Sequence, residues 1–403
     1  MLEAIAVLAT LLSGASAPAP FRSLAELDAA MSVAERSGDA EPFWSRIRNA
    51  GRMPLLFGDM AVFFHRSPAA RVEWRGDFTD WEPSPAAQGR RVGKTDVWTF
   101  RRTFRPDARL DYKLVEDGER WLVDPLNPQR QLGGYGPNSE IRMPGWKPPA
   151  HVVRDPGVPR GSFGPPEPIA SRKLGYAVNV RVYEPAGART PGARLPVLYV
   201  TDGSDYWNDD MGSLVITLDN LIASRRIPPL FAVFVDPWDP EHKANRREAE
   251  FVPGEDRLEK PIGACPFCEF LADELAPAME RRLPIDPARR GILGTSLGGF
   301  NAAFMGLRHP EQFSLLGIQS PALSSRKQPW LESAYAAAPK LPRRAVIDVG
   351  LYEEGFLERA RGLRSALAAR GVRTRHIEVP QGHSWGHWRA TAAEMLEFLY
   401  GER

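Results

Sequence analysis

The sequence predicts an open α/β domain that follows a small β-sandwich in a chain of 403 residues. Two observations predict this order. Short alternating strand patterns occupy the first part of the chain, and apolar runs that alternate with helical stretches occupy residues 169–403. A proline-rich segment separates them. A chain of this length usually needs more than one hydrophobic core, so two domains are the starting expectation.

The β-sandwich is assigned to residues 22–146. From Glu41 onward, apolar and polar residues alternate in short stretches, and turn residues recur about every ten positions, which is typical of an immunoglobulin-like sandwich. Examples are residues 60–64, 71–74, 97–100 and 110–115. Residues 147–168 carry many prolines and are expected to form a linker.

Six apolar runs in the second part have the length and composition of buried parallel strands. They are residues 196–200, 231–235, 291–293, 313–318, 345–349 and 376–379. Helical stretches are expected between and after them, including residues 270–282, 300–308, 356–370 and 390–400. Strands that alternate with helices predict an open, mostly parallel sheet.

Composition excludes several functions. The formal charge is +2, with 52 basic and 50 acidic residues and no basic stripe, so no nucleic-acid partner is expected. The two cysteines, Cys265 and Cys268, lack a second pair for a zinc site, so no metal is expected. They are expected either to form a short disulfide or to stay as thiols.

Residues 1–17 form a short apolar segment that ends in small residues, which resembles a secretory signal peptide, although Glu3 stands where a basic residue is usual. The segment is shorter than the ~20 residues that span a bilayer, so no stable membrane insertion is expected. The expected location is periplasmic or secreted, or cytoplasmic if this signal is not functional.

Gly294-Thr295-Ser296-Leu297-Gly298 lies between an expected strand and an expected helix. In that setting a G-x-S-x-G motif resembles the nucleophile elbow of α/β-hydrolases, in which a tight turn exposes the serine Oγ. Ser296 is therefore the candidate nucleophile. The N–H of Leu297, at the start of the helix, is a candidate oxyanion donor, and the N–H of Ser204, in the loop after residues 196–200, is the second.

A serine needs an adjacent base, and in α/β-hydrolases the order along the chain is serine, acid, histidine. His383 follows the last expected strand and is the candidate base, with His387 one turn further on as the alternative, whereas His376 lies within that strand. The acid should follow residues 345–349, where Glu353 and Glu354 are both in range. Glu353 is favoured as the group that orients the imidazole.

These segments resemble the enterochelin esterase and esterase-D superfamily. The resemblance rests on Asp202-Gly203, residues 294–299, Tyr352-Glu353 and residues 382–385, and it continues upstream in residues 124–129 and 139–145. It implies a serine esterase that needs no cofactor and supports Glu353 as the third triad member. Arg247, in Arg247-x-x-Glu250, is similar to a family signature and is expected either to contact substrate or to brace a loop.

The sequence contains further candidate binding residues. Trp385 and His387, which closely follow His383, are assigned to substrate binding. The N-terminal region also resembles glycogen-binding carbohydrate modules, which implies sugar-binding roles for Trp81, Lys113 and Trp121, with packing as the alternative.

Two substrates stay open. The resemblance favours hydrolysis of siderophore or related small-molecule esters, whereas the sugar-module residues and the export signal favour a feruloyl or acetyl-xylan type polysaccharide esterase. A third possibility is a carbohydrate-binding protein with a degenerate hydrolase domain, against which the intact elbow argues.

Overall fold

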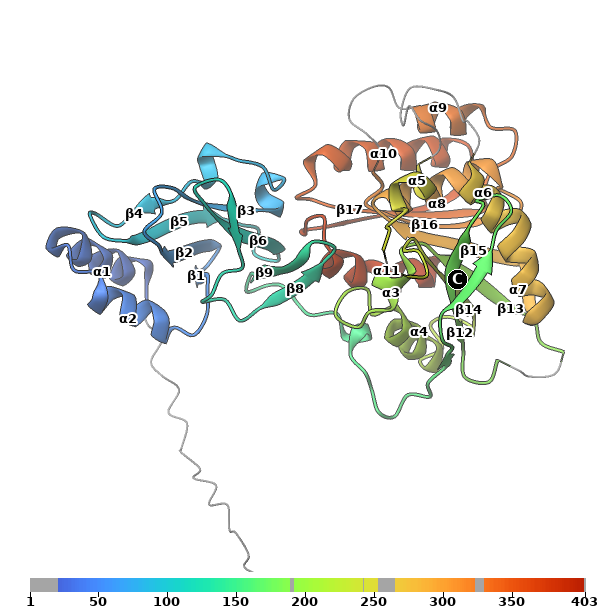
Figure 1. The fold of residues 1–403 in the computed structure, drawn as a ribbon, viewed down its shortest axis with the longest axis horizontal. Helices are drawn as coiled ribbons and strands as arrows, with labels where there is room; N and C mark the ends of the chain where they lie inside the picture. Colours follow the sequence, from blue (N-terminus) through green and yellow to red (C-terminus); the bar gives the residue numbers. More distant parts are fainter. Residues whose placement is uncertain (1–20, 189–191, 242, 253–264, 323–329, 402–403) are drawn as a thin grey trace, which may run out of the picture. The chain divides into compact units, whose positions relative to one another are not determined.

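A computed structural model describes residues 21–188, 192–241, 243–252, 265–322 and 330–401 (Figure 1). Its contacts divide the chain into two compact units. The first comprises Met1–Trp74, Pro85–Phe104 and Leu114–Pro128, and the second comprises Arg75–Ser84, Arg105–Lys113 and Gln129–Arg403. This division differs from the boundary predicted at residue 146, because three earlier segments group with the second unit. The predicted signal peptide lies outside the described residues.

The first unit begins with two helices that the strand pattern did not predict: α1 (Leu24–Ser37) and α2 (Glu41–Asn49). Ser23 caps α1, since its Oγ accepts a hydrogen bond from the Glu26 N–H at 3.1 Å. Leu27, Met31 and Ala34 lie on one buried face at helical spacing. The prediction of strands from Glu41 was therefore wrong, and the first strand starts at Leu55.

Two sheets follow. One has the order β1 (Leu55–Phe57), β2 (Met60–Arg66), β5 (Val97–Thr103), β4 (Arg90–Arg91). The other has the order β3 (Val72–Gly76), β6 (Arg109–Glu116), β9 (Gly136–Arg142), β8 (Arg130–Gly133), and β7 (Arg120–Leu122) pairs with β6. Short 3₁₀ turns occupy Asp77–Thr79 and Pro85–Ala87. Trp74 of β3 contacts Phe63 and Phe100 of the first sheet, with ring centroids 6.2 and 5.7 Å away.

The second unit contains a nine-stranded sheet. Its order is β10 (Ser162–Phe163), β12 (Ala177–Glu184), β14 (Phe231–Asp236), β13 (Leu195–Val200), β15 (Ile285–Thr295), β16 (Leu315–Gln319), β17 (Arg344–Gly350), β18 (Arg373–Val379). The six strands from β13 to β18 pair in parallel, as the apolar runs predicted. β10 and β11 (Glu167–Ala170) both pair with β12, so the end of the predicted linker belongs to the sheet. A 3₁₀ turn occupies Ala150–Val152.

Helices cover both faces of this sheet (Figure 1). Val197 and Tyr199 of β13 pack in one apolar core, and Leu198 and Val200 pack in the other, as alternation along a strand requires. The first core includes α6 (Pro266–Glu269), a π-helical turn (Phe270–Leu275), α7 (Ala276–Arg282), α8 (Leu297–Arg308), α9 (Trp330–Ala337), α10 (Glu354–Ala369) and Phe251 of α5 (Arg247–Phe251). The second includes α3 (Gly203–Trp207), α4 (Leu214–Ala223) and α11 (Trp385–Tyr400).

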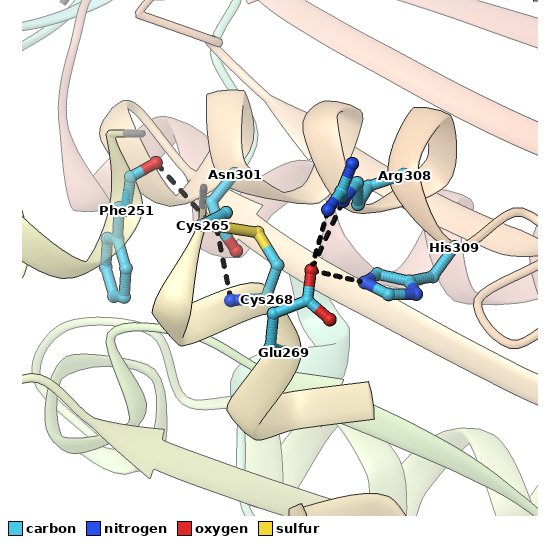
Figure 2. Close-up of a disulfide and its surroundings, with 7 residues drawn as sticks. All are labelled: Phe251, Cys265, Cys268, Glu269, Asn301, Arg308 and His309. Atoms are coloured by element: carbon cyan, nitrogen blue, oxygen red, sulfur yellow. Dashed lines mark hydrogen bonds and ion pairs between the residues drawn. A yellow bond between two sulfur atoms is a disulfide. The ribbon is translucent and has the colours of Figure 1, made fainter. Parts of the chain in front are cut away.

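The two cysteines form a disulfide at the start of α6 (Figure 2). Beside it, the Asn301 amide of α8 donates to the Phe251 carbonyl at 3.4 Å, and Glu269 accepts from Arg308 at 3.1 Å. Of the two states predicted for the cysteines, the structure has the disulfide, in a position that packs against the helix that begins after Ser296.

Candidate active site

Ser296 lies in the sharp turn that joins β15 to α8. Its backbone has φ 56° and ψ −116°, a conformation that L-residues rarely adopt, and its side chain is partly exposed. A Cβ on Gly294 would lie 2.2 Å from the Gly298 carbonyl oxygen, and one on Gly298 would lie 2.5 Å from Thr201 Oγ1. Only glycine fits at both positions, which explains the G-x-S-x-G spacing.

A chain of hydrogen bonds joins Ser296, His383 and Glu353. His383 Nδ1 lies 2.5 Å from Glu353 Oε1, and His383 Nε2 lies 2.9 Å from Ser296 Oγ. Because the carboxylate can only accept, Nδ1 carries the hydrogen, and Nε2 is free to accept the serine proton. The structure therefore brings together the three residues that the sequence proposed as nucleophile, base and acid.

Glu353 and its neighbour Glu354 differ in burial. Glu353 is buried just before α10, with 1% exposure, whereas Glu354 is exposed. The other carboxylate oxygen of Glu353, Oε2, accepts from the Gly350 N–H and from Ser320 Oγ at 2.8 Å. Burial alone would raise the pKa of Glu353, but the bond from His383 and the charges of nearby histidines outweigh it and hold that pKa below its usual value.

The candidate oxyanion donors lie at two helix starts. Leu297 is the first residue of α8, and Ser204 is the second residue of α3. The first N–H groups of a helix have no partner within the helix, so they can bind a developing negative charge. The Ser204 hydroxyl donates to Asp236 Oδ1 at 2.9 Å. Its backbone N–H, not its side chain, is therefore the group available for an oxyanion.

Arg247 connects the loop before α3 to the serine turn. Its Nε lies 2.6 Å from Asp202 Oδ1, and its Nη2 donates to Asp202 Oδ2 at 3.1 Å and to the Thr295 carbonyl at 3.0 Å. Asp202 is buried, with a positive φ of 53°. Of the two roles expected for Arg247, these contacts favour bracing of a loop.

We expect Arg247→Met to lower kcat by about 10- to 100-fold with little change in KM, because the Ser204 and Leu297 N–H groups lose their relative placement. Arg247→Lys should recover only part of this loss, since lysine cannot make the bidentate contact. Steady-state kinetics on p-nitrophenyl butyrate measure both. A rise in KM with unchanged kcat would assign Arg247 to substrate contact instead.

Glu250 of α5 is buried and accepts from the Tyr176 hydroxyl at 3.0 Å. Burial raises its pKa to about 8 from the ordinary 4.5, against the hydrogen bond from Tyr176 and the charge of Arg246. At pH values between about 4.5 and about 8, the folded protein therefore keeps a proton on Glu250 that the unfolded chain has already lost. The stability that this carboxyl contributes is full below about pH 4.5 and is lost as the pH rises towards 8.

Glu250→Gln should remove this pH dependence. We expect the urea midpoint of the wild-type protein to fall relative to that of the variant between pH 5 and pH 8, because the variant has no proton to lose. Urea titrations at half-unit intervals of pH measure the difference. A difference between the two proteins that does not change with pH would contradict the assigned shift.

Trp385 and His387 do not face solvent. Trp385 is 4% exposed and packs edge-on against Tyr206 and Trp388, with ring centroids 5.0 Å away in both cases. His387 is fully buried. A substrate contact requires an exposed surface, so these positions argue against the substrate-binding role that the sequence suggested. Both residues are buried because they lie on the face of α11 that packs against the sheet.

The loop that carries His383 is held by residues from earlier segments of the second unit. A Cβ on Gly382 would lie 2.1 Å from Asp77 Cγ, and one on Gly386 would lie 2.1 Å from Arg109 Cζ. Arg109 is buried, pairs with Asp111 at 2.7 Å, and donates to Ser384 Oγ at 2.8 Å. The sequence did not indicate this support, because only the fold brings residues 77 and 109 to the histidine loop.

Two further residues near His383 were not predicted. Ser320 follows β16 and is fully buried, and its Oγ donates to Glu353 and accepts from Trp388 Nε1 at 2.9 Å. The ring of Phe356 lies 4.7 Å from that of His383. The position of Ser320 directly after a parallel strand was the available signal, since such strand ends line the sites of open α/β sheets.

The sugar-binding candidates belong to different units. Trp121 is in the first unit and is 42% exposed. Trp81 and Lys113 are in the second unit; the Trp81 indole donates to Asp77 Oδ1 at 3.2 Å, and Lys113 Nζ donates to the Tyr135 carbonyl at 3.4 Å. Sugar binding by these residues stays a prediction.

Within the described residues, no helix is long and apolar enough to cross a membrane. The same part of the chain contains no group of three histidine, cysteine, aspartate or glutamate side chains that could hold a metal ion.

An elbow serine bonded to a histidine, on an open α/β sheet, is the arrangement of α/β-hydrolases. Residues 171–399 match the family model described as "Putative esterase". This match covers more than half of the chain, and the chain therefore belongs to that esterase family. The comparison confirms the prediction that the chain is an esterase. Arg109 and Asp77, which support the histidine loop, lie outside the matched residues.

Two curated relatives are similar to more than half of this chain. The iron(III) enterobactin esterase of Escherichia coli O6:H1 (strain CFT073) is 27% identical over 260 residues, which cover 57% of this chain and 59% of that protein. The endo-1,4-β-xylanase/feruloyl esterase of Xylanibacter ruminicola is 24% identical over 245 residues, which cover 57% of this chain and 30% of that protein. The matched region therefore spans 59% of the length of the enterobactin esterase and less of the xylanase.

Solved structures extend the likeness to the N-terminal region. The enterobactin esterase of Shigella flexneri, solved in the presence of enterobactin, has a TM-score of 0.67 and 21% identity, and covers 84% of this chain and 92% of its own. The ferric enterobactin esterase of Salmonella typhimurium has a TM-score of 0.67 and 19% identity, with coverage of 84% and 93%. These matches confirm the predicted fold class, an α/β-hydrolase domain preceded by a β-rich domain.

Proposed function

We propose that this chain is a serine carboxylic-ester hydrolase of the enterobactin-esterase type that acts through Ser296, His383 and Glu353. The observation that carries the proposal is the hydrogen-bond chain from Glu353 through His383 to a strained, partly exposed serine. Such geometry supplies a nucleophile, its base and the group that fixes the tautomer of the base. No cofactor is required.

In the first half-reaction, His383 Nε2 takes the proton of Ser296 as Oγ attacks the ester carbonyl. The resulting oxyanion is stabilised by the N–H groups of Leu297 and Ser204. His383, now positively charged and held by Glu353, gives its proton to the alcohol oxygen, which leaves. The acyl group stays on Ser296.

In the second half-reaction, water takes the place of the alcohol. His383 removes a proton from the water as it attacks the acyl-enzyme, and the second oxyanion uses the same two N–H groups. Collapse returns the proton to Ser296 and releases the carboxylic acid. Glu353 stays ionised throughout, which the bonds from Gly350 and Ser320 favour.

The relatives named as enterobactin esterases support a siderophore or a related small-molecule ester as the substrate. A polysaccharide-linked feruloyl or acetyl ester is the second candidate. The exposed Trp121 ring and the xylanase/feruloyl esterase relative favour it. Aromatic rings bind the apolar faces of sugars, so Trp121 would serve as a binding surface for the polysaccharide.

A substrate panel tests the proposal. The panel compares a tricatechol siderophore trilactone with and without iron, methyl ferulate and acetylated xylan, each with the full chain and with Ser296→Ala. We expect the highest kcat/KM on the siderophore trilactone and none in the variant. Preference for acetylated xylan, reduced by Trp121→Ala, would establish the second candidate. Hydrolysis of none of the four, with p-nitrophenyl butyrate still cleaved, would refute both substrate classes.

We also propose export to the periplasm or the medium. The disulfide between Cys265 and Cys268 supports this location, because such bonds persist in oxidising compartments. Fractionation of cells that express the full chain tests it. Recovery of a mature protein shortened at its N-terminus outside the cytoplasm is expected, and a full-length cytoplasmic protein would contradict it.

A further inference from the structure

His387 is a buried imidazole that lies between two buried carboxylates. It is fully buried in α11, one turn after the loop of His383. Its Nδ1 lies 3.1 Å from the Gly382 carbonyl and 3.5 Å from Glu353 Oε2, and its Nε2 lies 3.6 Å from Asp348 Oδ2. One ring therefore contacts the candidate acid, a second acid and the residue before the candidate base.

The hydrogen-bonding groups fix where the protons lie. A carbonyl oxygen only accepts, so the Nδ1 that faces Gly382 carries a hydrogen. The opposite nitrogen, Nε2, makes no hydrogen bond within the described residues and lies 3.6 Å from Asp348 Oδ2, so a lone pair on Nε2 would meet the lone pairs of an ionised carboxylate. One further proton, on Nε2 or on Oδ2, removes that repulsion. In either arrangement the pair of His387 and Asp348 has no net charge.

This neutrality matters because Glu353 and Asp348 are close and buried. They are 1% and 0% exposed. Among the described residues, the charged partners recorded within 4 Å of the two carboxylates are histidines. The remaining bonds to Asp348 come from neutral groups: the Ser320 N–H, the Gln319 amide and the Thr391 hydroxyl. Two adjacent ionised carboxylates without a compensating proton would repel each other strongly.

We propose that His387 is a positioning residue that cancels the charge of Asp348 and so keeps Glu353 ionised and bonded to His383. This inference rests on the proposed function of Glu353 and deepens it. The sequence suggested that His387 contacts substrate, and the proposed role is instead indirect. His387 touches neither Ser296 nor an exposed surface. It acts through Glu353 and the Gly382 carbonyl.

The pKa directions agree with this arrangement. Burial raises the pKa of Asp348, the positive charge of His387 and two hydrogen bonds oppose that rise, and the charge of Glu353 adds to it. Glu353 has the opposite net direction, with His383 and then His387 among the groups that lower its pKa. Of the two carboxyl groups, Asp348 therefore has the raised pKa and Glu353 the lowered one.

The test compares the pH dependence of kcat/KM in His387→Phe and in the wild-type enzyme, with p-nitrophenyl butyrate as substrate. Phenylalanine fills the space of the imidazole but cannot hold a proton. We expect the acidic limb to move to higher pH by about one unit, because Asp348 then competes with Glu353 for ionisation and Glu353 takes up a proton at higher pH. At a fixed pH on that limb, kcat/KM should fall about tenfold.

Asp348→Asn provides the matched rescue. The double variant His387→Phe/Asp348→Asn removes the uncompensated charge, so its acidic limb should return to within about 0.3 of a pH unit of wild type. A residue that only fills space would not respond to Asp348→Asn. If His387→Phe does not fold, His387→Gln, which is polar but equally unable to carry the proton, replaces it with the same expected shift.

The outcomes separate the two proposals. An unshifted limb in His387→Phe, or a shift that Asp348→Asn does not reverse, overturns the role of His387 while Ser296→Ala remains inactive. Activity that survives in Ser296→Ala overturns the proposed function itself, whatever the His387 variants do. Titration of active sites with a fluorophosphonate gives kcat per functional serine, so loss of folded enzyme cannot imitate the expected shift.

Discussion

Ser296→Ala is expected to lower kcat for p-nitrophenyl butyrate by about 10⁴- to 10⁶-fold. The reason is that Ser296 Oγ is the atom that forms the acyl-enzyme, and the alanine variant leaves His383 with no hydroxyl to deprotonate at 2.9 Å. Any residual rate comes from water that His383 activates directly, aided by the oxyanion donors. Initial rates at saturating substrate, with the protein concentration raised for the variant, measure the loss.

Ser204→Ala is the matched control for this prediction. It removes a second hydroxyl near the site but keeps the backbone N–H that is proposed to bind the oxyanion. Its kcat should stay within about fivefold of wild type, since the lost bond to Asp236 affects the loop only indirectly. A large loss in Ser204→Ala together with a small loss in Ser296→Ala would reverse the assignment of the nucleophile.

The second largest effect is expected for Glu353→Gln, with kcat lower by about 10⁴-fold. The glutamine side chain is nearly isosteric, so the loop stays folded, but it carries no charge to stabilise the imidazolium. Its amide also competes with the His383 Nδ1–H for the same space and favours the wrong tautomer. The measurement is again kcat on p-nitrophenyl butyrate, supported by the thermal midpoint of each variant.

Glu354→Gln is the matched control, because it makes the same chemical change at the neighbouring residue. Glu354 is exposed at the start of α10, so its loss should change kcat by less than about twofold. Equal effects in the two variants would mean that neither glutamate orients His383. A larger effect in Glu354→Gln would mean that the structure assigns the wrong neighbour.

The sequence predicted the parts of this molecule that depend on local pattern. The apolar runs predicted all six parallel strands from β13 to β18, because buried parallel strands are almost uniformly apolar. The glycines around Ser296 predicted the elbow, because a tight turn excludes a Cβ at those positions. The order of serine, acid and histidine then pointed to Glu353 and His383, which lie within hydrogen-bonding distance of each other in the structure.

The sequence could not predict features that arise from long-range contacts. Helix α2 was missed because the strand-like pattern of the following residues was extended back to Glu41, and α1 lies before that pattern, where no helix was assigned. The burial of His387 and Trp385 depends on which face of α11 packs on the sheet. The support of the histidine loop by Arg109 joins residues that are 275 positions apart in the chain, for which the local sequence holds no signal.

The central claim is that Ser296 carries the acyl group, and covalent labelling tests it most directly. The wild-type protein is inactivated with a fluorophosphonate, digested and mapped by mass spectrometry, with the activity followed in parallel. The account predicts one adduct per chain, on the peptide that contains Ser296, in proportion to the lost activity, and no adduct in Ser296→Ala. Full inactivation with the label on another residue, such as Ser320, would contradict it.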